Sequence, residues 1–186
     1  AFASIGEDDY VIAPEKGRET YDDLIRVLSA RDLMPSRIAH LWLVTKDEGH
    51  RPGSSFFHRS QEHGFFSLLF LAQALADEDT SEDIHINVVT SDAAQVRGEA
   101  LRYPEKATAM GPAWVIPREI PNVGCSVLDV SLAGLGAGRR ERDVLEARIT
   151  DQVLEELLAP ATGVTAAVRA EKRFELAYKH PAEHTN

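Results

Sequence analysis

The sequence has 186 residues, of which 27% are charged and 44% are hydrophobic, and its formal net charge is −10. This length and composition are typical of one globular domain with a sizeable core and exclude a disordered chain. The excess of acidic residues disfavours nucleic acid and anionic membranes as partners, because both are bound through Lys and Arg.

The first predicted elements are a short strand over residues 10–13, a helix over 19–30 and a strand over 37–44. Tyr21 and Ile25 lie on the inner face of that helix. The segment 37–44 is almost continuously apolar, which is typical of a parallel strand covered on both faces. Residues 1–9 lack the basic and apolar regions of a signal peptide, and the sequence does not begin with Met, so we expect part of a larger protein.

A polar loop over residues 45–61 and a helix over 62–77 are predicted next. The helix is apolar on most sides, so we expect it to be buried between a sheet and other helices. Its apolar run is shorter than the roughly 20 residues needed to cross a bilayer. The acidic residues that begin at Asp77 predict its end, because the helix dipole disfavours negative charge there.

The next strand is predicted over residues 84–90, with Ser91 or Asp92 capping a short helical turn. Pro104 can begin a helix, which we expect to end near Gly111 and Pro112. The following segment should be extended because it contains Pro117 and Pro121.

The last predicted elements are a strand over 123–130, a Gly-rich loop over 132–140, a helix over 143–158, and two short strands over 164–169 and 173–178. The residues expected to face inward from the helix are Val144, Ala147, Ile149, Val153, Leu154 and Leu157. Alternating helices and strands predict an α/β fold with a mostly parallel sheet, right-handed crossovers and a closing strand pair. The single cysteine, Cys125, lies in an apolar strand and cannot form an internal disulfide, which favours a cytoplasmic protein.

The loop Gly134-Leu-Gly136-Ala-Gly138 follows a strand and precedes a helix, as a dinucleotide phosphate loop would. Arg139, however, stands where the fingerprint requires glycine, and the acidic residue about 20 positions on, Glu155 or its neighbour, lies within a helix. A surface connection is the favoured interpretation, and nucleotide binding is kept as an alternative.

Three histidines, His50, His58 and His63, lie in or beside the long loop and could approach a shared metal. No Cys or carboxylate stands at a recognisable ligand spacing, so we interpret them as ordinary loop residues. His40 and His85 occupy strands, where a hydrogen-bonded histidine is more common than a catalytic base.

The motifs of nucleophilic serine enzymes, P-loops and short-chain reductases are absent from the sequence. Adjacent acidic pairs occur at Asp22-Asp23 and Glu155-Glu156, but neighbouring residues do not share a helix face and so do not form an acid/base pair. We therefore predict no catalytic, cofactor-binding or metal-binding residue in this chain.

Five ordered segments, together with the closing strands, are similar to one protein family. They are His40-Leu-Trp42, the run 64–75, the run 104–112, the run 115–122 and the run 125–129. They closely resemble the N-terminal, structural half of the ketoreductase domain of modular type I polyketide synthases, from about Tyr10 to Tyr178. Ile120 departs from the pattern, because tyrosine is expected there.

The resemblance implies a truncated Rossmann-like fold without a cofactor site. Residues 1–186 would be a single structural subdomain that lacks the family's first strand-helix-strand and the catalytic half that follows. That half would bind NADPH and reduce a β-ketoacyl group carried by an acyl carrier protein, while this chain would act as a non-catalytic scaffold. The alternatives are an independent nucleotide-binding enzyme that uses Gly134, Gly136 and Gly138, or a free-standing interaction domain. If the first strand is missing, one sheet edge should be open to self-association.

Overall fold

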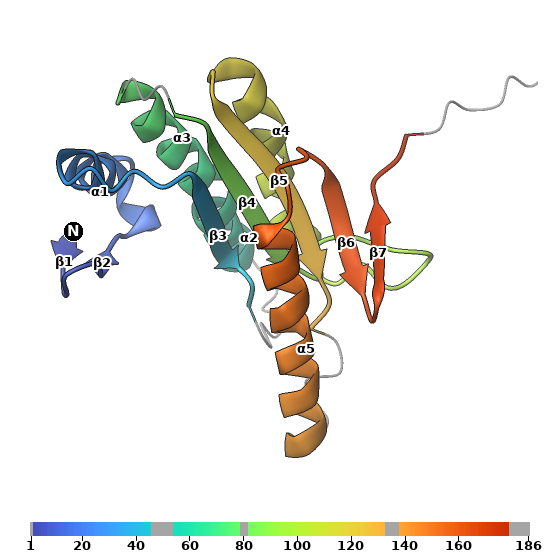
Figure 1. Ribbon diagram of the computed structural model, residues 1–186. Coiled ribbons are helices and arrows are strands. Elements are labelled where there is room, and N and C mark those ends of the chain that lie inside the picture. The colour runs from blue at the N-terminus through green and yellow to red at the C-terminus, as the bar shows by residue number, and fades with distance from the viewer. Residues whose placement is uncertain (1, 46–53, 79–81, 133–137, 179–186) are drawn as a thin grey trace, which may run out of the picture.

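The computed structural model of the protein describes residues 2–45, 54–78, 82–132 and 138–178 (Figure 1). Its centre is a five-stranded sheet with the order β3-β4-β5-β6-β7. The strands are β3 (Arg37–Leu43), β4 (Ile84–Ser91), β5 (Val123–Val130), β6 (Thr165–Arg169) and β7 (Lys172–Glu175). The first four run parallel and β7 pairs antiparallel with β6. The predicted α/β, Rossmann-like fold with a closing strand pair is confirmed.

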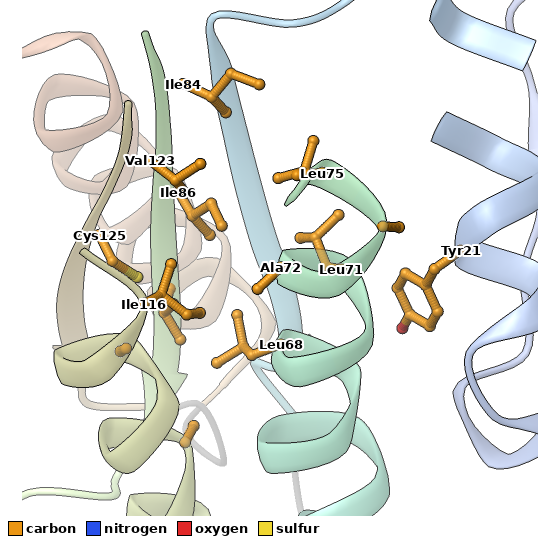
Figure 2. Packing of buried hydrophobic residues seen from close by; sticks show 14 of the residues in the cluster. Tyr21, Leu68, Leu71, Ala72, Leu75, Ile84, Ile86, Ile116, Val123 and Cys125 are labelled. Carbon is orange, nitrogen blue, oxygen red and sulfur yellow. The ribbon is translucent and has the colours of Figure 1, made fainter. Parts of the chain in front are cut away.

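Helices cover the two faces of this sheet unequally. On one face α3 (Ser67–Asp77) and α4 (Met110–Glu119) pack against β4 and β5, and α1 (Glu19–Ala30) packs against α3 (Figure 2). On the other face lies α5 (Arg139–Leu158). Since side chains alternate along a strand, each central strand contributes to both cores.

The two cores follow this alternation. The larger core, between the sheet and α1, α3 and α4, contains Ile86 and Val88 of β4. The smaller core contains Val89 of the same strand and packs against Ile149 and Val153 of α5. The eight residues of β4 are all buried, including four polar ones, as expected for a central parallel strand covered on both faces.

The N-terminal residues lie outside the main sheet. Strands β1 (Ala3–Ser4) and β2 (Tyr10–Val11) form their own antiparallel pair, and the 3₁₀ helix η1 (Pro14–Lys16) connects them to α1. The strand predicted over 10–13 therefore exists, but it pairs locally. The helix α1 that follows has the bounds predicted from the sequence, residues 19–30.

The buried helix ends at Asp77 as predicted, but it begins earlier. Helix α2 (Ser54–Ser60) and the π-helical turn η2 (Gln61–Phe66) run directly into α3. The loop predicted over 45–61 is thus wrong from Ser54 onward, while residues 46–53 lie outside the described residues. The π turn widens the helix where Gly64 meets β3: a Cβ at Gly64 would lie 2.8 Å from Leu43 Cδ1.

The prediction that β3 is covered on both faces is wrong. Leu41 is 47% exposed and Trp42 is 36% exposed. Strand β3 stands at the end of the strand order, and the core under α5 contains residues of β4, β5 and β6 but none of β3. The described contact of α5 with this strand is at its first residue, where Arg37 Nη1 donates to the Leu157 carbonyl at 2.7 Å. An apolar strand sequence favours burial, but the strand is buried only where another helix or strand packs against it.

Helix α4 also differs from its prediction. The 3₁₀ helix η3 (Pro104–Ala109) continues into α4, which runs through Gly111, Pro112 and Pro117 to Glu119. Pro112 is tolerated because it lies in the first turn of α4, where its missing N–H has no helical partner to lose. The predicted capped turn at Ser91 or Asp92 is wrong as well: Asp92 has a φ of 56° and begins an irregular segment.

Helix α5 begins at Arg139, four residues before its predicted start, and only part of its predicted inner face packs on the sheet, where it is partly buried. Ile149 and Val153 pack against the sheet, whereas Val144 is 66% exposed and Leu154 is 48% exposed. The strand order advances in one direction from β3 to β6, yet α3 and α4 cross on one face and α5 on the other. The third crossover therefore has the opposite hand to the first two, so the crossovers are not all right-handed as predicted.

Candidate functional site

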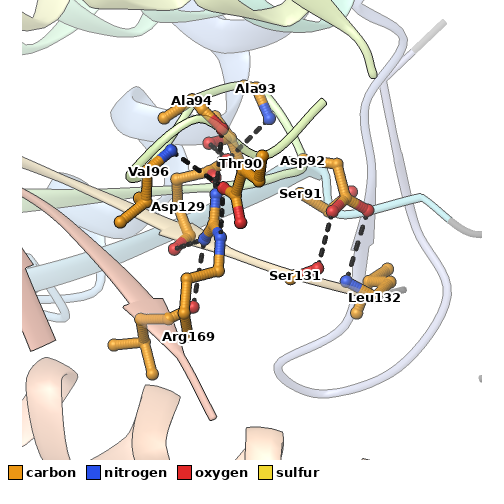
Figure 3. Close-up of polar contacts among 12 residues, drawn as sticks. Thr90, Ser91, Asp92, Ala93, Ala94, Val96, Asp129, Ser131, Leu132 and Arg169 are labelled. Atoms are coloured by element: carbon orange, nitrogen blue, oxygen red, sulfur yellow. Dashed lines mark hydrogen bonds and ion pairs between the residues drawn. The ribbon is translucent and has the colours of Figure 1, made fainter. Parts of the chain in front are cut away.

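The carboxyl edge of the parallel strands is the first place to look for a site, because open α/β sheets bind ligands there. Among the described residues, the ends of β4, β5 and β6 are joined by a buried ion pair with its hydrogen bonds (Figure 3). A buried lysine joins the ends of β3 and β4. Charged and polar side chains of the chain itself thus fill much of this edge.

Asp129, near the end of β5, is the acidic centre of the first network. Its side chain is 1% exposed, and its Oδ1 accepts hydrogen bonds from Thr90 Oγ1 at 2.7 Å and from the Ala93 backbone N–H at 2.8 Å. Its Oδ2 accepts one from Arg169 Nη2, also at 2.7 Å. The carboxylate is therefore satisfied by groups from β4, β6 and the segment after β4.

Arg169, the last residue of β6, uses its guanidinium entirely within the protein. Besides Asp129, it donates from Nε to Glu99 Oε1 at 2.7 Å and from Nη2 to the Ala94 carbonyl at 2.9 Å. Burial lowers the pKa of Arg169, but the hydrogen bonds to Asp129 and Glu99 outweigh this effect, so its pKa is raised. These bonds fasten the segment 94–99 across the carboxyl edge.

Lys106 of η3 closes the neighbouring part of the edge. It is 1% exposed, and its Nζ donates to Thr45 Oγ1 and Ser91 Oγ, each at 2.8 Å, and to the Ser91 carbonyl at 3.1 Å. The ammonium also lies 4.6 Å from the ring centroid of Tyr103. Asp92 binds the end of β5 in the same region, through Ser131 Oγ at 2.8 Å.

Sequence reasoning did not identify these residues as a group. The available signal was one acidic residue in the strand Val-Leu-Asp129-Val and one basic residue at the end of Ala-Val-Arg169. Opposite charges at the same ends of two apolar strands predict an ion pair if the strands are neighbours. That neighbourhood is a property of the topology, which the sequence pattern alone did not supply.

The strand histidines are hydrogen-bonded, which confirms that prediction. His40 Nε2 lies 2.8 Å from Ser67 Oγ, which also accepts a hydrogen bond from Tyr21 Oη at 2.7 Å. Burial lowers the pKa of His40 to about 4, and burial raises the pKa of Tyr21 to about 12. On the opposite face, His85 Nε2 lies 2.9 Å from Ser126 Oγ. Both histidines therefore connect strands to their surroundings within the core.

The three histidines considered as metal ligands lie only partly within the described residues. His50 lies outside the described residues. His58 belongs to α2, and His63 packs on Trp42 with 5.4 Å between the ring centroids. Within the described ranges, no group of three or more His, Cys, Asp or Glu residues is arranged to hold a metal ion.

The Gly-rich loop considered for nucleotide binding is largely undescribed. Gly134 and Gly136 lie outside the described residues, and Gly138 is the N-cap of α5. The acidic pair further along α5 diverges: Glu155 is exposed, whereas Glu156 forms an ion pair with Arg173 of β7 at 2.8 Å. The pair at the start of α1 is also structural, because Asp22 and Asp23 pair with nearby arginines.

An open groove of about 1000 Å³ lies at the opposite, amino edge of the sheet. Its walls come from α4, from residues 161–165 and from the chain after β7. Trp114 of α4 is 41% exposed there, and its Nε1 donates to Thr165 Oγ1 at 2.9 Å. Cys125 also lines the groove, but its side chain is buried, and burial raises the pKa of its thiol to about 12.

Comparison with known proteins agrees with this architecture. The family model described as "Beta-ketoacyl synthase-like, N-terminal" matches residues 1–125. No curated protein matches the chain.

Several solved structures are similar to the chain, among them the following three. A multidomain structure with adenylation, ketoreductase and pseudo Asub parts, from a keto acid-selecting NRPS module, aligns with a TM-score of 0.71 and 26% identity over 93% of this chain. An N-terminal ketoreductase from the macrolactin assembly line gives 0.57 and 15% over 98% of it. A short-chain dehydrogenase from Mycobacterium avium gives 0.54 and 14% over 90%. The chain spans only 13%, 35% and 62% of these proteins, and the last two show the fold alone.

The fold and its neighbours define a Rossmann-like α/β domain of the type found in ketoreductases and short-chain dehydrogenases. The chain belongs to the family of beta-ketoacyl synthase-like N-terminal domains. The resemblance to the structural half of a modular synthase ketoreductase, predicted from the sequence, is confirmed. No helix within the described ranges is both long and apolar enough to cross a membrane.

Proposed function

We propose that this chain is the non-catalytic scaffold half of a ketoreductase in a modular synthase, such as a polyketide synthase. Its role would be to stabilise a catalytic half that binds NADPH and reduces a β-ketoacyl group on an acyl carrier protein. The other domains of the same module would then be its partners.

The observation that carries this proposal is the state of the carboxyl edge. A dinucleotide-binding fold leaves a crevice there for the cofactor. Here Arg169, Asp129 and Glu99 bridge the ends of β5 and β6 to the segment after β4, and Lys106 binds the ends of β3 and β4. A side chain that donates several hydrogen bonds inside the protein supports structure rather than turnover, because its donors are already satisfied.

The neighbours add support of a different kind. Of the three structures, one is a multidomain module that contains a ketoreductase and another is a ketoreductase of an assembly line. Because this chain aligns with only 13% and 35% of them, the activities of the whole proteins enter this proposal as expectations.

The test is to express the longer protein with and without residues 1–186 and to follow NADPH-dependent reduction of a small β-keto thioester. The proposal predicts that removing the chain shortens the thermal half-life of the activity at least tenfold, and that adding the purified chain restores part of it. An unchanged half-life after removal would contradict a scaffold role.

Arg169→Met in the longer protein separates structure from catalysis. It should lower the melting temperature and leave kcat at low temperature unchanged. A large loss of kcat with an unchanged melting temperature would assign Arg169 to catalysis and refute the proposed role of the carboxyl edge.

A further inference from the structure

We infer that the catalytic half docks in the groove at the amino edge of the sheet, between α4 and the chain that leaves β7. This inference rests on the proposed function, and it adds a location to it. The occupant is the polypeptide that follows this chain, which would insert apolar side chains beside Trp114.

The path of the chain is the first argument. After β7 ends at Glu175, the Leu176 backbone N–H donates to the Thr165 carbonyl at 2.9 Å, which holds the departing chain beside β6. Leu176 and Tyr178 then line the groove. In the proposed longer protein, a domain that continues from this point would meet the groove intramolecularly, which favours its docking over that of a separate molecule.

The chemistry of the walls is the second argument. Trp114 is 41% exposed, Leu176 is 51% exposed and Tyr178 is 83% exposed, although all three are large and mainly apolar. Trp and Tyr dominate binding energies at protein interfaces, especially in concave, well-packed positions. The hydrogen bond from Trp114 to Thr165 fixes the indole before binding, so little side-chain freedom is lost on docking.

A second copy of this chain is a poorer occupant. Each copy carries a net charge of −10, so bringing two copies together opposes like charges. Two other exposed apolar residues lie elsewhere: Trp42 is on β3, and Val144 is in the second turn of α5, about 21 Å along the helix axis from Leu158. Neither lines the groove, so both serve as internal controls.

The decisive comparison uses the only two tryptophans, which have nearly equal exposure, 41% for Trp114 and 36% for Trp42. Hydroxyl-radical footprinting with mass spectrometry should be performed on this chain alone and on the longer protein. The inference predicts that oxidation of Trp114 and Tyr178 falls several-fold in the longer protein while Trp42 keeps its rate. Protection of Trp42 instead, or unchanged oxidation of Trp114, would overturn it.

A pair of variants in the longer protein tests the energetic role of the groove. The double variant Leu176→Asp/Tyr178→Asp changes two exposed side chains, so this chain alone should keep its melting temperature. We expect the thermal half-life of the reductase activity to shorten about tenfold, whereas Val144→Asp on α5 should leave it unchanged. If removing residues 1–186 has no effect, the proposed function fails; if removal matters but the groove variant behaves like Val144→Asp, only the docking site is wrong.

Discussion

The ion pair between Arg169 and Asp129 offers the sharpest test of how the carboxyl edge is held together. The Arg169 side chain is 12% exposed and that of Asp129 is 1% exposed, with 2.7 Å between Nη2 and Oδ2. Arg169→Met keeps most of the apolar stem and removes the charge. It leaves a buried carboxylate without its cation, and it removes the donors that hold Glu99 and the Ala94 carbonyl.

The expected cost follows from these contacts. Removing one partner of a buried ion pair costs about 3–5 kcal/mol. Asp129 would still accept hydrogen bonds from Thr90 and from the Ala93 backbone, so the lower end, about 3 kcal/mol, applies here. For a domain of this size, that corresponds to a fall of about 6–12 °C in melting temperature.

Urea and thermal unfolding of three variants would measure this cost. Arg173→Met is the matched control, because its ion pair with Glu156 is more exposed and should contribute no more than about 1 kcal/mol. The double variant Asp129→Asn/Arg169→Met should recover part of the loss, since it no longer buries an unpaired charge. If Arg169→Met costs no more than the control, the reasoning about the carboxyl edge is refuted.

Three further predictions concern buried groups. The pKa of His40 is lowered to about 4 in the folded protein. As the pH falls, the His40 imidazole of the unfolded chain therefore binds a proton near pH 6.5, before that of the folded chain does. The free energy of unfolding should therefore decrease between pH 7 and pH 4, by about 3 kcal/mol for this group, and unfolding curves of His40→Gln should show a smaller decrease. Gly124→Ala should cost about 1–3 kcal/mol, because its Cβ would lie 2.6 Å from His85 Nδ1, whereas Gly138→Ala meets nothing within 4 Å; equal melting temperatures would contradict this. The Cys125 thiol, buried with a pKa of about 12, should react with a disulfide reagent at pH 8 only as the protein unfolds, so rapid labelling of the folded chain would show that the groove reaches it.

The spacing of apolar residues along the sequence predicted the bounds of several helices and strands correctly. Helix α1 and strand β5 have the predicted bounds, and β4 extends one residue further than predicted. Each of these segments places apolar residues at the spacing of its helix or strand. The resemblance carried by the ordered segments supplied the fold class beyond what periodicity alone could give.

The errors arise where the outcome depends on distant elements. Leu41 is exposed because the core on the α5 face contains no residue of β3, and Val144 is exposed because only one side of α5 meets the sheet. Helix α4 contains Pro112 because the α-helix begins at Met110, after a separate 3₁₀ helix, so that this proline lies in its first turn. The pairing of Asp129 with Arg169 follows from the neighbourhood of β5 and β6, which is a property of the whole sheet.

The central claim is that cofactor and chemistry belong to another part of the synthase. A calorimetric NADPH titration of this chain alone, beside one of the longer protein, tests it most directly. The account predicts saturable binding by the longer protein and none by this chain. Micromolar binding by this chain alone, weakened by Gly136→Trp, would contradict the scaffold role and support nucleotide binding by the Gly-rich loop.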